Sequence, residues 1–185
     1  MRIVGYRESW PAEFEAIRER LSVTLGQVAV RIEHIGSTAV PGLAAKDVID
    51  LQVTVADLDP AVLVPAILAA GFVSSASGPH GVDHQPAGSN STKAKDWAKL
   101  LFHAPSNSRR VNIHVRVTGR ANERYARLFR DYLRNHATEA TTYSEFKQRL
   151  AMLDIETATY ADIKDPVCDL VMVAAELWAA RVGWR

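Results

Sequence analysis

The sequence predicts an α/β or α+β fold, in which a mixed β-sheet is flanked by helices and followed by a helical section. Three observations lead to this prediction. Apolar runs of strand length are concentrated in the middle of the chain, amphipathic helical patterns dominate both ends, and no internal repeat is present. A length of 185 residues with 48% apolar and 23% charged residues suits one globular domain and excludes a mainly disordered or coiled-coil chain.

The first third of the chain alternates between helical and strand patterns. A helix over about 10–25 has Pro11 in its first turn and Gly26 as a stop signal. A second helix opens at Asp59-Pro60, a typical start signal. The predicted elements of this part are the helix over 10–25, strands over 28–35 and 48–55, the helix from 59 to about 71, and a weak strand over 72–75.

The remaining two thirds begin with a long irregular segment over 76–96, which is either a mobile lid or disordered. Strands follow over 97–103 and 110–117. Three helical stripes come next, and we expect all of them to face the core: Tyr125, Leu128, Phe129, Tyr132 and Leu133; Tyr143, Phe146, Leu150 and Leu153; Leu170, Val173, Ala174, Leu177 and Trp178. The predicted organisation is a single domain over 1–185, with a sheet-bearing core to about 118 and C-terminal helices over about 119–185.

Composition also bounds the cellular setting. The single cysteine, Cys168, excludes an intramolecular disulfide and predicts a reducing, cytoplasmic compartment. The longest apolar stretch, residues 61–72, contains a proline and is shorter than the roughly 20 residues that a membrane-spanning helix needs. The N-terminal residues lack the apolar core of a signal peptide. We therefore expect neither a membrane segment nor a secretion signal.

Charge is unevenly distributed along the chain. The formal net charge is only +1, yet residues 93–134 contain eleven Lys or Arg and three Asp or Glu. Such a stretch either forms a solvated helix face or contacts phosphate groups. Nucleic-acid binding through it would weaken steeply with salt. It is the less favoured interpretation, because the chain as a whole is nearly neutral.

Residues 31–53 carry the features typical of a chemical site. A predicted strand runs into Gly36-Ser37, twelve residues follow, and the next strand contains Asp50 and Gln52. A glycine at such a turn lets backbone N–H groups approach an oxyanion, to which the hydroxyl of Ser37 adds a donor. Positions 50 and 52 share one face of the strand. Two carboxylates there would hold Mg²⁺ or Mn²⁺ for phosphoryl transfer.

This spacing resembles the signature of the nucleotidyltransferase superfamily, in which a glycine-containing turn precedes a pair of acidic residues. Here the second acid is replaced by Gln52, and the later strand, where the superfamily places a third carboxylate, offers Asn112 and His114. Asp50 is therefore the candidate catalytic residue, and Asp50, Gln52 and His114 are the candidate metal ligands. One carboxylate in place of three predicts a degenerate metal site.

Other side chains could line the same cleft. An ionised Asp50 in an apolar strand needs a partner, either a bound ligand or an ion pair with a residue such as Lys46 or Arg110. Lys46 could bind a phosphate or carboxylate, or be a solvated surface residue. His34 and His114 could join Asp50 as metal ligands, or each be a structural histidine. The candidate ligand-binding residues are Gly36, Ser37, Lys46, Gln52, Lys99, Arg110, Asn112 and His114.

A closer resemblance covers most of the chain. The string EHIGSTAVPGLAAKDVIDLQV is similar to the GrpB family, in the version that follows the kinase in actinobacterial dephospho-coenzyme A kinases. The similarity continues through WAKLLFHAPSNSRRVNIHVRV, NERYARLFRDYLRNH, YSEFKQRL and TYADIKDP, and extends from about Tyr6 to Trp184. The resemblance implies a nucleotidyltransferase-like fold and the family's label of a dephospho-coenzyme A kinase or protein-folding accessory domain. It implies no established reaction.

Kinase activity does not follow from the resemblance, because the chain contains no Gly-Lys pair and hence no phosphate-binding loop of the P-loop type. We expect a stand-alone accessory module whose degenerate cleft holds an anionic, nucleotide-like ligand or a protein partner. The alternative is a metal-dependent nucleotidyl or phosphoryl transferase with an incomplete carboxylate site. Asp50 would be indispensable to such an enzyme and dispensable to the module.

Overall fold

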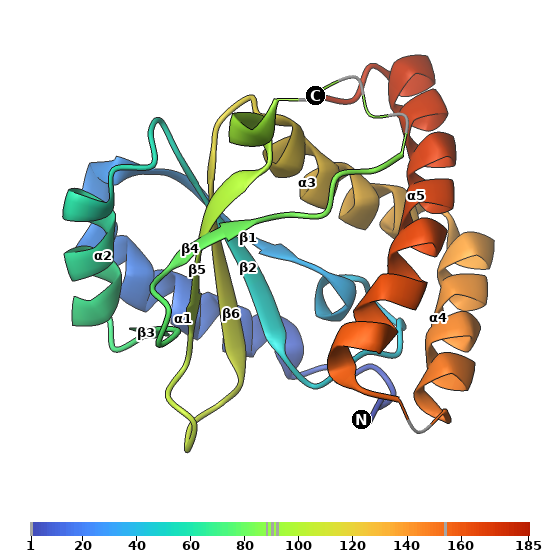
Figure 1. Cartoon of the computed structure of the whole chain (residues 1–185). Helices are drawn as coiled ribbons and strands as arrows, with labels where there is room; N and C mark the ends of the chain where they lie inside the picture. Colours follow the sequence, from blue (N-terminus) through green and yellow to red (C-terminus); the bar gives the residue numbers. More distant parts are fainter. Residues whose placement is uncertain (1, 88, 90, 92, 154) are drawn as a thin grey trace.

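The computed structural model describes residues 2–87, 89, 91, 93–153 and 155–185. In this part of the chain, helices and strands follow one another as shown in Figure 1. The elements are, in order, α1 (Trp10–Leu25), η1 (Gly26–Val28), β1 (Ala29–Ile35), η2 (Ser37–Ala39), β2 (Ile49–Val55), α2 (Pro60–Ala69), β3 (Val73–Ser74), β4 (His80–Val82), η3 (Ala94–Asp96), β5 (Ala98–His103), β6 (Val111–Val117), α3 (Ala121–Asn135), α4 (Ala137–Ala151) and α5 (Thr157–Val182).

The strands form one mixed sheet in the order β1-β2-β6-β5-β3, with β4 paired to β5. The central pair β2–β6 is parallel, whereas β1–β2 and β5–β6 are antiparallel. Figure 1 shows α1 and α2 on one side of the sheet and α3, α4 and α5 on the other. The prediction of a mixed sheet flanked by helices is therefore confirmed. No helix in the described ranges is long and apolar enough to cross a membrane.

Strand β2 separates an apolar face of the sheet from a polar one. Its odd-numbered residues, Ile49 to Val55, are completely buried and belong to the core shared with α1 and α2. Its even-numbered residues are Asp50, Gln52 and Thr54, which point to the opposite face because side chains alternate along a strand. The polar residues of β2 therefore face the C-terminal helices.

The C-terminal helices have a second apolar cluster, and here one sequence prediction is wrong. Residues of α5 that face this cluster include Met172, Ala175 and Ala179, together with Cys168. Leu170, Val173 and Leu177 are instead 63–71% exposed, and Leu153 of the preceding segment is 55% exposed. Apolar residues occupy two faces of α5, so periodicity alone did not identify the buried one.

The segment over 76–96 is more ordered than the sequence predicts. His80–Val82 form β4, which pairs antiparallel with β5. Ala94–Asp96 form the short helix η3. Strand β4 shows no alternation of apolar and polar residues, because it is short, contains Gly81 and lies at the edge of the sheet. It is therefore held by pairing with β5, which no local sequence pattern indicates. Residues 88, 90 and 92 lie outside the described residues.

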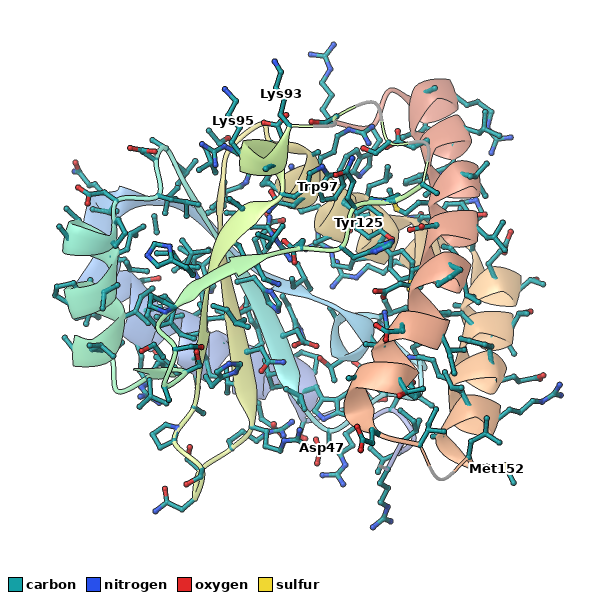
Figure 2. All side chains as sticks on the ribbon, in the orientation of Figure 1. Asp47, Lys93, Lys95, Trp97, Tyr125 and Met152 are labelled. Carbon is teal, nitrogen blue, oxygen red and sulfur yellow. The ribbon has the colours of Figure 1, made fainter. Side chains whose placement is uncertain are left out.

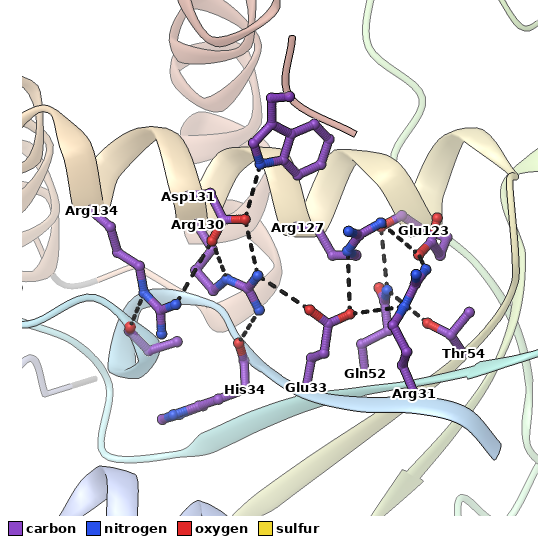
Figure 3. Close-up of polar contacts among 12 residues, drawn as sticks. Arg31, Glu33, His34, Gln52, Thr54, Glu123, Arg127, Arg130, Asp131 and Arg134 are labelled. Carbon is purple, nitrogen blue, oxygen red and sulfur yellow. Dashed lines mark hydrogen bonds and ion pairs between the residues drawn. The ribbon is translucent and has the colours of Figure 1, made fainter. Parts of the chain in front are cut away.

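Basic residues of α3 form ion pairs with acidic residues of α3 itself and of strand β1 (Figure 3). Arg127 Nε and Arg130 Nη2 lie 3.2 and 3.3 Å from the carboxylate of Glu33 on β1. Arg31 of β1 reaches back to Glu123 at the start of α3, at 2.5 Å. These arginines connect α3 to the sheet, so Arg127 and Arg130 are engaged within the protein and do not form a solvated helix face.

Candidate functional site

A cleft of about 540 Å³ lies between the polar face of the sheet and the helices α3, α4 and α5. The β1–η2 turn, strands β2 and β6, and residue Asp83 after β4 form one side of it. The cleft contains most of the candidate site residues predicted from the sequence: the catalytic candidate Asp50, and Gly36, Ser37, Lys46, Lys99, Asn112 and His114.

Gln52 and Arg110 are the two predicted site residues that do not line the cleft. Gln52 is fully buried beneath α3, where its Oε1 accepts a hydrogen bond from Arg116 Nη1 at 2.7 Å. Its Nε2 donates to Thr54 Oγ1 and to the carbonyl oxygen of Glu123, each at 3.3 Å. Both ends of the amide are therefore engaged within the protein. Arg110 is exposed at the start of β6.

The Gly36 turn and the carboxylate of Asp50 pack directly against each other. Gly36 has a φ of 70°, and a Cβ there would come within 2.8 Å of Asp50 Oδ2. Asp50 Oδ1 accepts a hydrogen bond from Asn112 Nδ2 at 2.7 Å across the parallel β2–β6 pair. Burial raises the pKa of Asp50, although the hydrogen bond from Asn112 acts in the opposite direction. The turn therefore needs glycine for both its backbone angle and its close contact.

Gly36→Ala should destabilise the protein by about 1–3 kcal/mol through backbone strain and also displace Asp50. Gly42→Ala is a matched control, because Gly42 has a φ of 76° but nothing within 4 Å of the added Cβ. Urea denaturation of both variants separates the two causes. A larger loss in Gly36→Ala is expected from the contact with Asp50, and equal losses would mean that only the backbone angle matters.

A buried polar cluster lies beside Asp50. Burial alone would raise the pKa of Asp83, but Arg116 and Lys99 hold this pKa far below its ordinary value. Lys99 Nζ lies 2.5 Å from Asp83 Oδ1, and Arg116 Nε lies 2.8 Å from Asp83 Oδ2. Lys99 is thus inside the cleft but already has a carboxylate partner.

His114 sits between this cluster and Asp50. Its Nδ1 lies 3.3 Å from Lys99 Nζ and 3.4 Å from Arg116 Nη2, and its Nε2 lies 4.0 Å from Asp50 Oδ1. Burial, assisted by Arg116 and Lys99, holds the pKa of His114 well below its usual value. The imidazole is therefore neutral, and its Nδ1 accepts hydrogen bonds from the two basic residues.

Two lysines of the cleft have a different environment. Lys147 of α4 is 3% exposed, and its Nζ donates to Ser37 Oγ at 2.8 Å and to the carbonyl oxygen of Ala44 at 2.6 Å. Lys46 Nζ lies 4.3 Å from the centre of the Tyr160 ring. Within the described part of the chain, no carboxylate forms an ion pair with either ammonium group. Both groups face the cleft.

The pKa values of these lysines reflect that environment. Burial lowers the pKa of Lys147 to about 7, and the neighbouring Lys164 contributes in the same direction. Burial, followed by Lys164 and Arg110, also lowers the pKa of Lys46. Lys164 itself pairs with Asp165, at 3.2 Å. This end of the cleft is therefore rich in positive charge that carboxylates of the described chain balance only in part.

Lys147 and Lys164 were missed by the sequence analysis, although a signal was available. Lys147 follows Tyr143 by four residues and precedes Leu150 by three, so it lies on the buried stripe of its helix. Lys164 lies four residues after Tyr160 and four before Cys168 in the same way. A lysine at a core position of an amphipathic helix needs a buried partner or a ligand.

Aromatic side chains form part of the cleft wall. Trp97 and Tyr125 lie edge to face with their ring centres 6.4 Å apart, and Figure 2 shows both between the strands and α5. Phe129 continues this wall, stacked on Tyr125 at 6.3 Å. Trp97 is 3% exposed and donates through Nε1 to the carbonyl oxygen of Ser91 at 3.1 Å. It therefore supports the wall more than it presents an open stacking surface.

The donor set around Asp50 fits a divalent metal ion poorly. Among the described residues, no group of three His, Cys, Asp or Glu side chains could hold a metal. Gln52 is engaged elsewhere, and His114 faces two basic side chains. His34 lies outside the cleft, stacked on Phe14 with its Nε2 3.0 Å from Thr38 Oγ1. His34 is therefore a structural histidine, which was the alternative to its role as a metal ligand.

Known proteins are similar to this chain in sequence. The dephospho-CoA kinase of Mycobacterium tuberculosis is 36% identical to this chain over an alignment that covers all of the chain and 48% of that protein. The chain thus spans about half the length of these curated relatives. A UPF0157 protein of Halalkalibacterium halodurans is 29% identical, with 94% of this chain and 81% of that protein covered.

A solved structure and a family model also match this chain over most of its length. The crystal structure of the conserved protein GrpB from Enterococcus faecalis superposes with a TM-score of 0.72 at 24% identity, covering 96% of this chain and 99% of that one. It shows the same fold. The family described as GrpB protein matches residues 1–173. The match covers the whole sheet, α3, α4 and the larger part of α5. The chain therefore belongs to the GrpB family.

Proposed function

We propose that this protein is a binding module whose cleft holds an anionic, nucleotide-like small molecule. The observation that carries the proposal is the pair of ammonium groups, Lys46 and Lys147, that face the cleft without a carboxylate partner in the described chain. An anion bound at Lys46 would supply the countercharge that this end of the cleft lacks.

The energetics favour such a ligand. Burial of a charged lysine is costly unless the charge is paired, which is why the pKa values of Lys46 and Lys147 are lowered. A phosphate or carboxylate bound at Lys46 would reverse that effect there by favouring the protonated amine of Lys46. The cleft volume of about 540 Å³ lies within the range of roughly 300–1,000 Å³ that is typical of small-molecule sites.

The shape of the cleft suggests the rest of the ligand. Positive charge lies where α4 and α5 meet the Gly36 turn, and Tyr125 and Phe129 provide an apolar wall of the same cleft. A molecule with an anionic group and a flat ring, such as a nucleotide, matches both features. In the relatives named dephospho-CoA kinase, the matching region accompanies a second region of comparable length. Dephospho-coenzyme A and coenzyme A therefore belong among the compounds to be tested.

The test is a thermal-shift and calorimetric screen of inorganic phosphate, nucleotides, coenzyme A and dephospho-coenzyme A, each with and without Mg²⁺ or Mn²⁺. A ligand that binds the folded state raises the unfolding midpoint by mass action. Lys46→Met should weaken binding about 10- to 100-fold, the value of a hydrogen bond to a charged group. Lys93→Met is the matched control, because Lys93 points outward from the surface in Figure 2.

Asp50→Asn separates this proposal from the alternative of a metal-dependent transferase. A binding module should retain its ligand, and should bind it no more weakly, because a negative charge beside the cleft has been removed. Loss of binding in Asp50→Asn together with a strict need for Mg²⁺ or Mn²⁺ would contradict the module and support the transferase. Failure of every anion to bind would contradict both.

A further inference from the structure

Ser37 and Lys147 form a polar pair inside the cleft that anion binding alone does not require. Their Oγ and Nζ atoms are 2.8 Å apart, although the residues are separated by 110 positions in the sequence. The Nζ atom of Lys147 is also fixed by the carbonyl oxygen of Ala44, at 2.6 Å. Ser37 begins η2 directly after the Gly36 turn, and both side chains line the cleft.

This geometry is that of an activated serine. A hydroxyl becomes a nucleophile when a base lies within hydrogen-bond distance and a third group orients that base. Ser–Lys pairs perform this role in some hydrolases. Here Lys147 is the candidate base and the carbonyl oxygen of Ala44 is the orienting group.

A lysine acts as a base only when it is unprotonated. The ammonium form of Lys147 has no ion-pair partner among the described carboxylates, and Lys164 adds a repelling charge. Cys168, Asp50 and the Tyr143 ring, whose centre lies 4.7 Å from Nζ, favour the charged form, but burial outweighs them. Burial in this setting lowers the pKa of Lys147 to about 7, so a substantial fraction of the amine is neutral near neutral pH. An exposed lysine would be almost entirely protonated under the same conditions.

We propose that Ser37 and Lys147 act as a nucleophile and base that hydrolyse carboxylic esters of anionic compounds bound in the cleft. The inference rests on the proposed function for the position of the substrate, and it adds a reaction to that site. The anionic part of the ester would contact Lys46, and the carbonyl carbon would lie beside Ser37 Oγ.

The reaction balances without a further reagent. Ser37 Oγ attacks the carbonyl carbon while its proton passes to Lys147 Nζ, and the tetrahedral oxyanion collapses with breakage of the ester C–O bond. The leaving alkoxide takes the proton from Lys147, which leaves an acyl ester on Ser37. Water then attacks this ester while Lys147 accepts its proton, and Ser37 Oγ takes that proton from Lys147 as its C–O bond to the acyl group breaks. The products are a carboxylic acid, the alcohol and the original serine.

Labelling with an alkyl phosphonofluoridate tests the nucleophile in the whole protein. The serine oxygen displaces fluoride from phosphorus and the proton leaves with the base, so peptide mass mapping identifies the modified residue. We expect Ser37 to be labelled, at a rate that rises between about pH 6 and about pH 8 as the base loses its proton. Ser37→Ala should remove the label.

Two substitutions of Lys147 test the base. Lys147→Arg keeps a cation that can donate to Ser37 but cannot be deprotonated, and Lys147→Met removes the charge as well. We expect labelling at least about 100-fold slower in both, the usual contribution of general-base catalysis. Ser144→Ala is the matched control, because Ser144 Oγ accepts from the Ala44 amide at 3.2 Å and lines a different pocket. In the Ser144→Ala variant, Ser37 should be labelled at the normal rate.

The outcomes distinguish this inference from the proposed function. An unlabelled Ser37 in the native protein, or a labelling rate independent of pH, would overturn the inference even if the substitutions at position 147 prevent folding. Normal labelling of Lys147→Arg would also overturn it. If anions bind but Ser37 is not labelled, the proposed binding module stands and the nucleophile–base pair is wrong. If Ser37 is labelled and no anion slows the labelling, the nucleophile–base pair stands and the binding module is wrong.

Discussion

Asp83→Ala should lower the free energy of unfolding by about 3–5 kcal/mol, the largest effect that we expect from a single substitution. Asp83 accepts hydrogen bonds from Lys99 Nζ at 2.5 Å and from Arg116 Nε at 2.8 Å. It also accepts one from Asn122 Nδ2 at 3.0 Å. Arg116 is 5% exposed, so removal of the carboxylate leaves a buried guanidinium without its countercharge.

Urea denaturation measures this loss, and two further variants locate its cause. Asp162→Ala removes an exposed acid and should change stability by less than about 0.5 kcal/mol. The double variant Asp83→Ala/Arg116→Met should lose less than the sum of the single changes, because it removes the unpaired charge as well. Additive losses would mean that the ion pair is not the source of the effect.

Acidification from about pH 6.5 to about pH 4 should cost the protein about 3 kcal/mol of stability through His34 alone. His34 is 7% exposed, and its Nε2–H is the donor to Thr38 Oγ1, because the Thr38 hydroxyl itself donates to the carbonyl oxygen of Val48 at 3.2 Å. Burial, with contributions from Arg134 and Arg130, lowers the pKa of His34 to about 4 from its model-compound value of 6.5.

The sign follows from proton uptake. Between these two pKa values the unfolded chain binds a proton at His34 and the folded protein does not, so lower pH favours unfolding. The loss begins as the pH falls below about 6.5 and stops below about 4, where both states are protonated. His34→Gln should be less stable at neutral pH, because it loses the stacking on Phe14, but should lack this pH dependence.

Denaturation curves at a series of pH values check the second prediction. His80→Gln serves as the control, because His80 is exposed on β4 and its substitution should leave the dependence unchanged. The comparison is between slopes of stability against pH, so titration of carboxylates common to all variants cancels. Equal slopes in the native protein and in His34→Gln would show that His34 does not carry the effect.

The sequence predicted the fold well where side-chain periodicity and turn residues agree. The run from β1 through the Gly36 turn to β2 lies as expected, and Asp50 shares a face with Gln52 as strand alternation requires. Strand alternation shows which face of the sheet a side chain points to, but not whether a helix covers that side chain. Asp50 opens onto the cleft, whereas Gln52, two residues further along, is covered by α3.

The site was predicted only on its sheet side. Gly36, Ser37, Lys46 and Asp50 are close in sequence, so a local motif could indicate them. Lys147 reaches them from more than a hundred residues away, and no local pattern specifies which helix will cover a given strand. The polarity of a core position in α4 was the one available signal, and the register of α5 was ambiguous because that helix has two apolar faces.

The contacts of Lys147 with Ser37 and Ala44 also have a consequence for how the protein folds. They join segments 110 and 103 residues apart, so they require α4 to dock beside the β1–β2 connection. Contacts of such sequence separation carry the largest loop-closure entropy and contribute late to folding. The proposed anion binding therefore requires the docked C-terminal helices, and its recovery during refolding should mark their docking rather than the assembly of the strands.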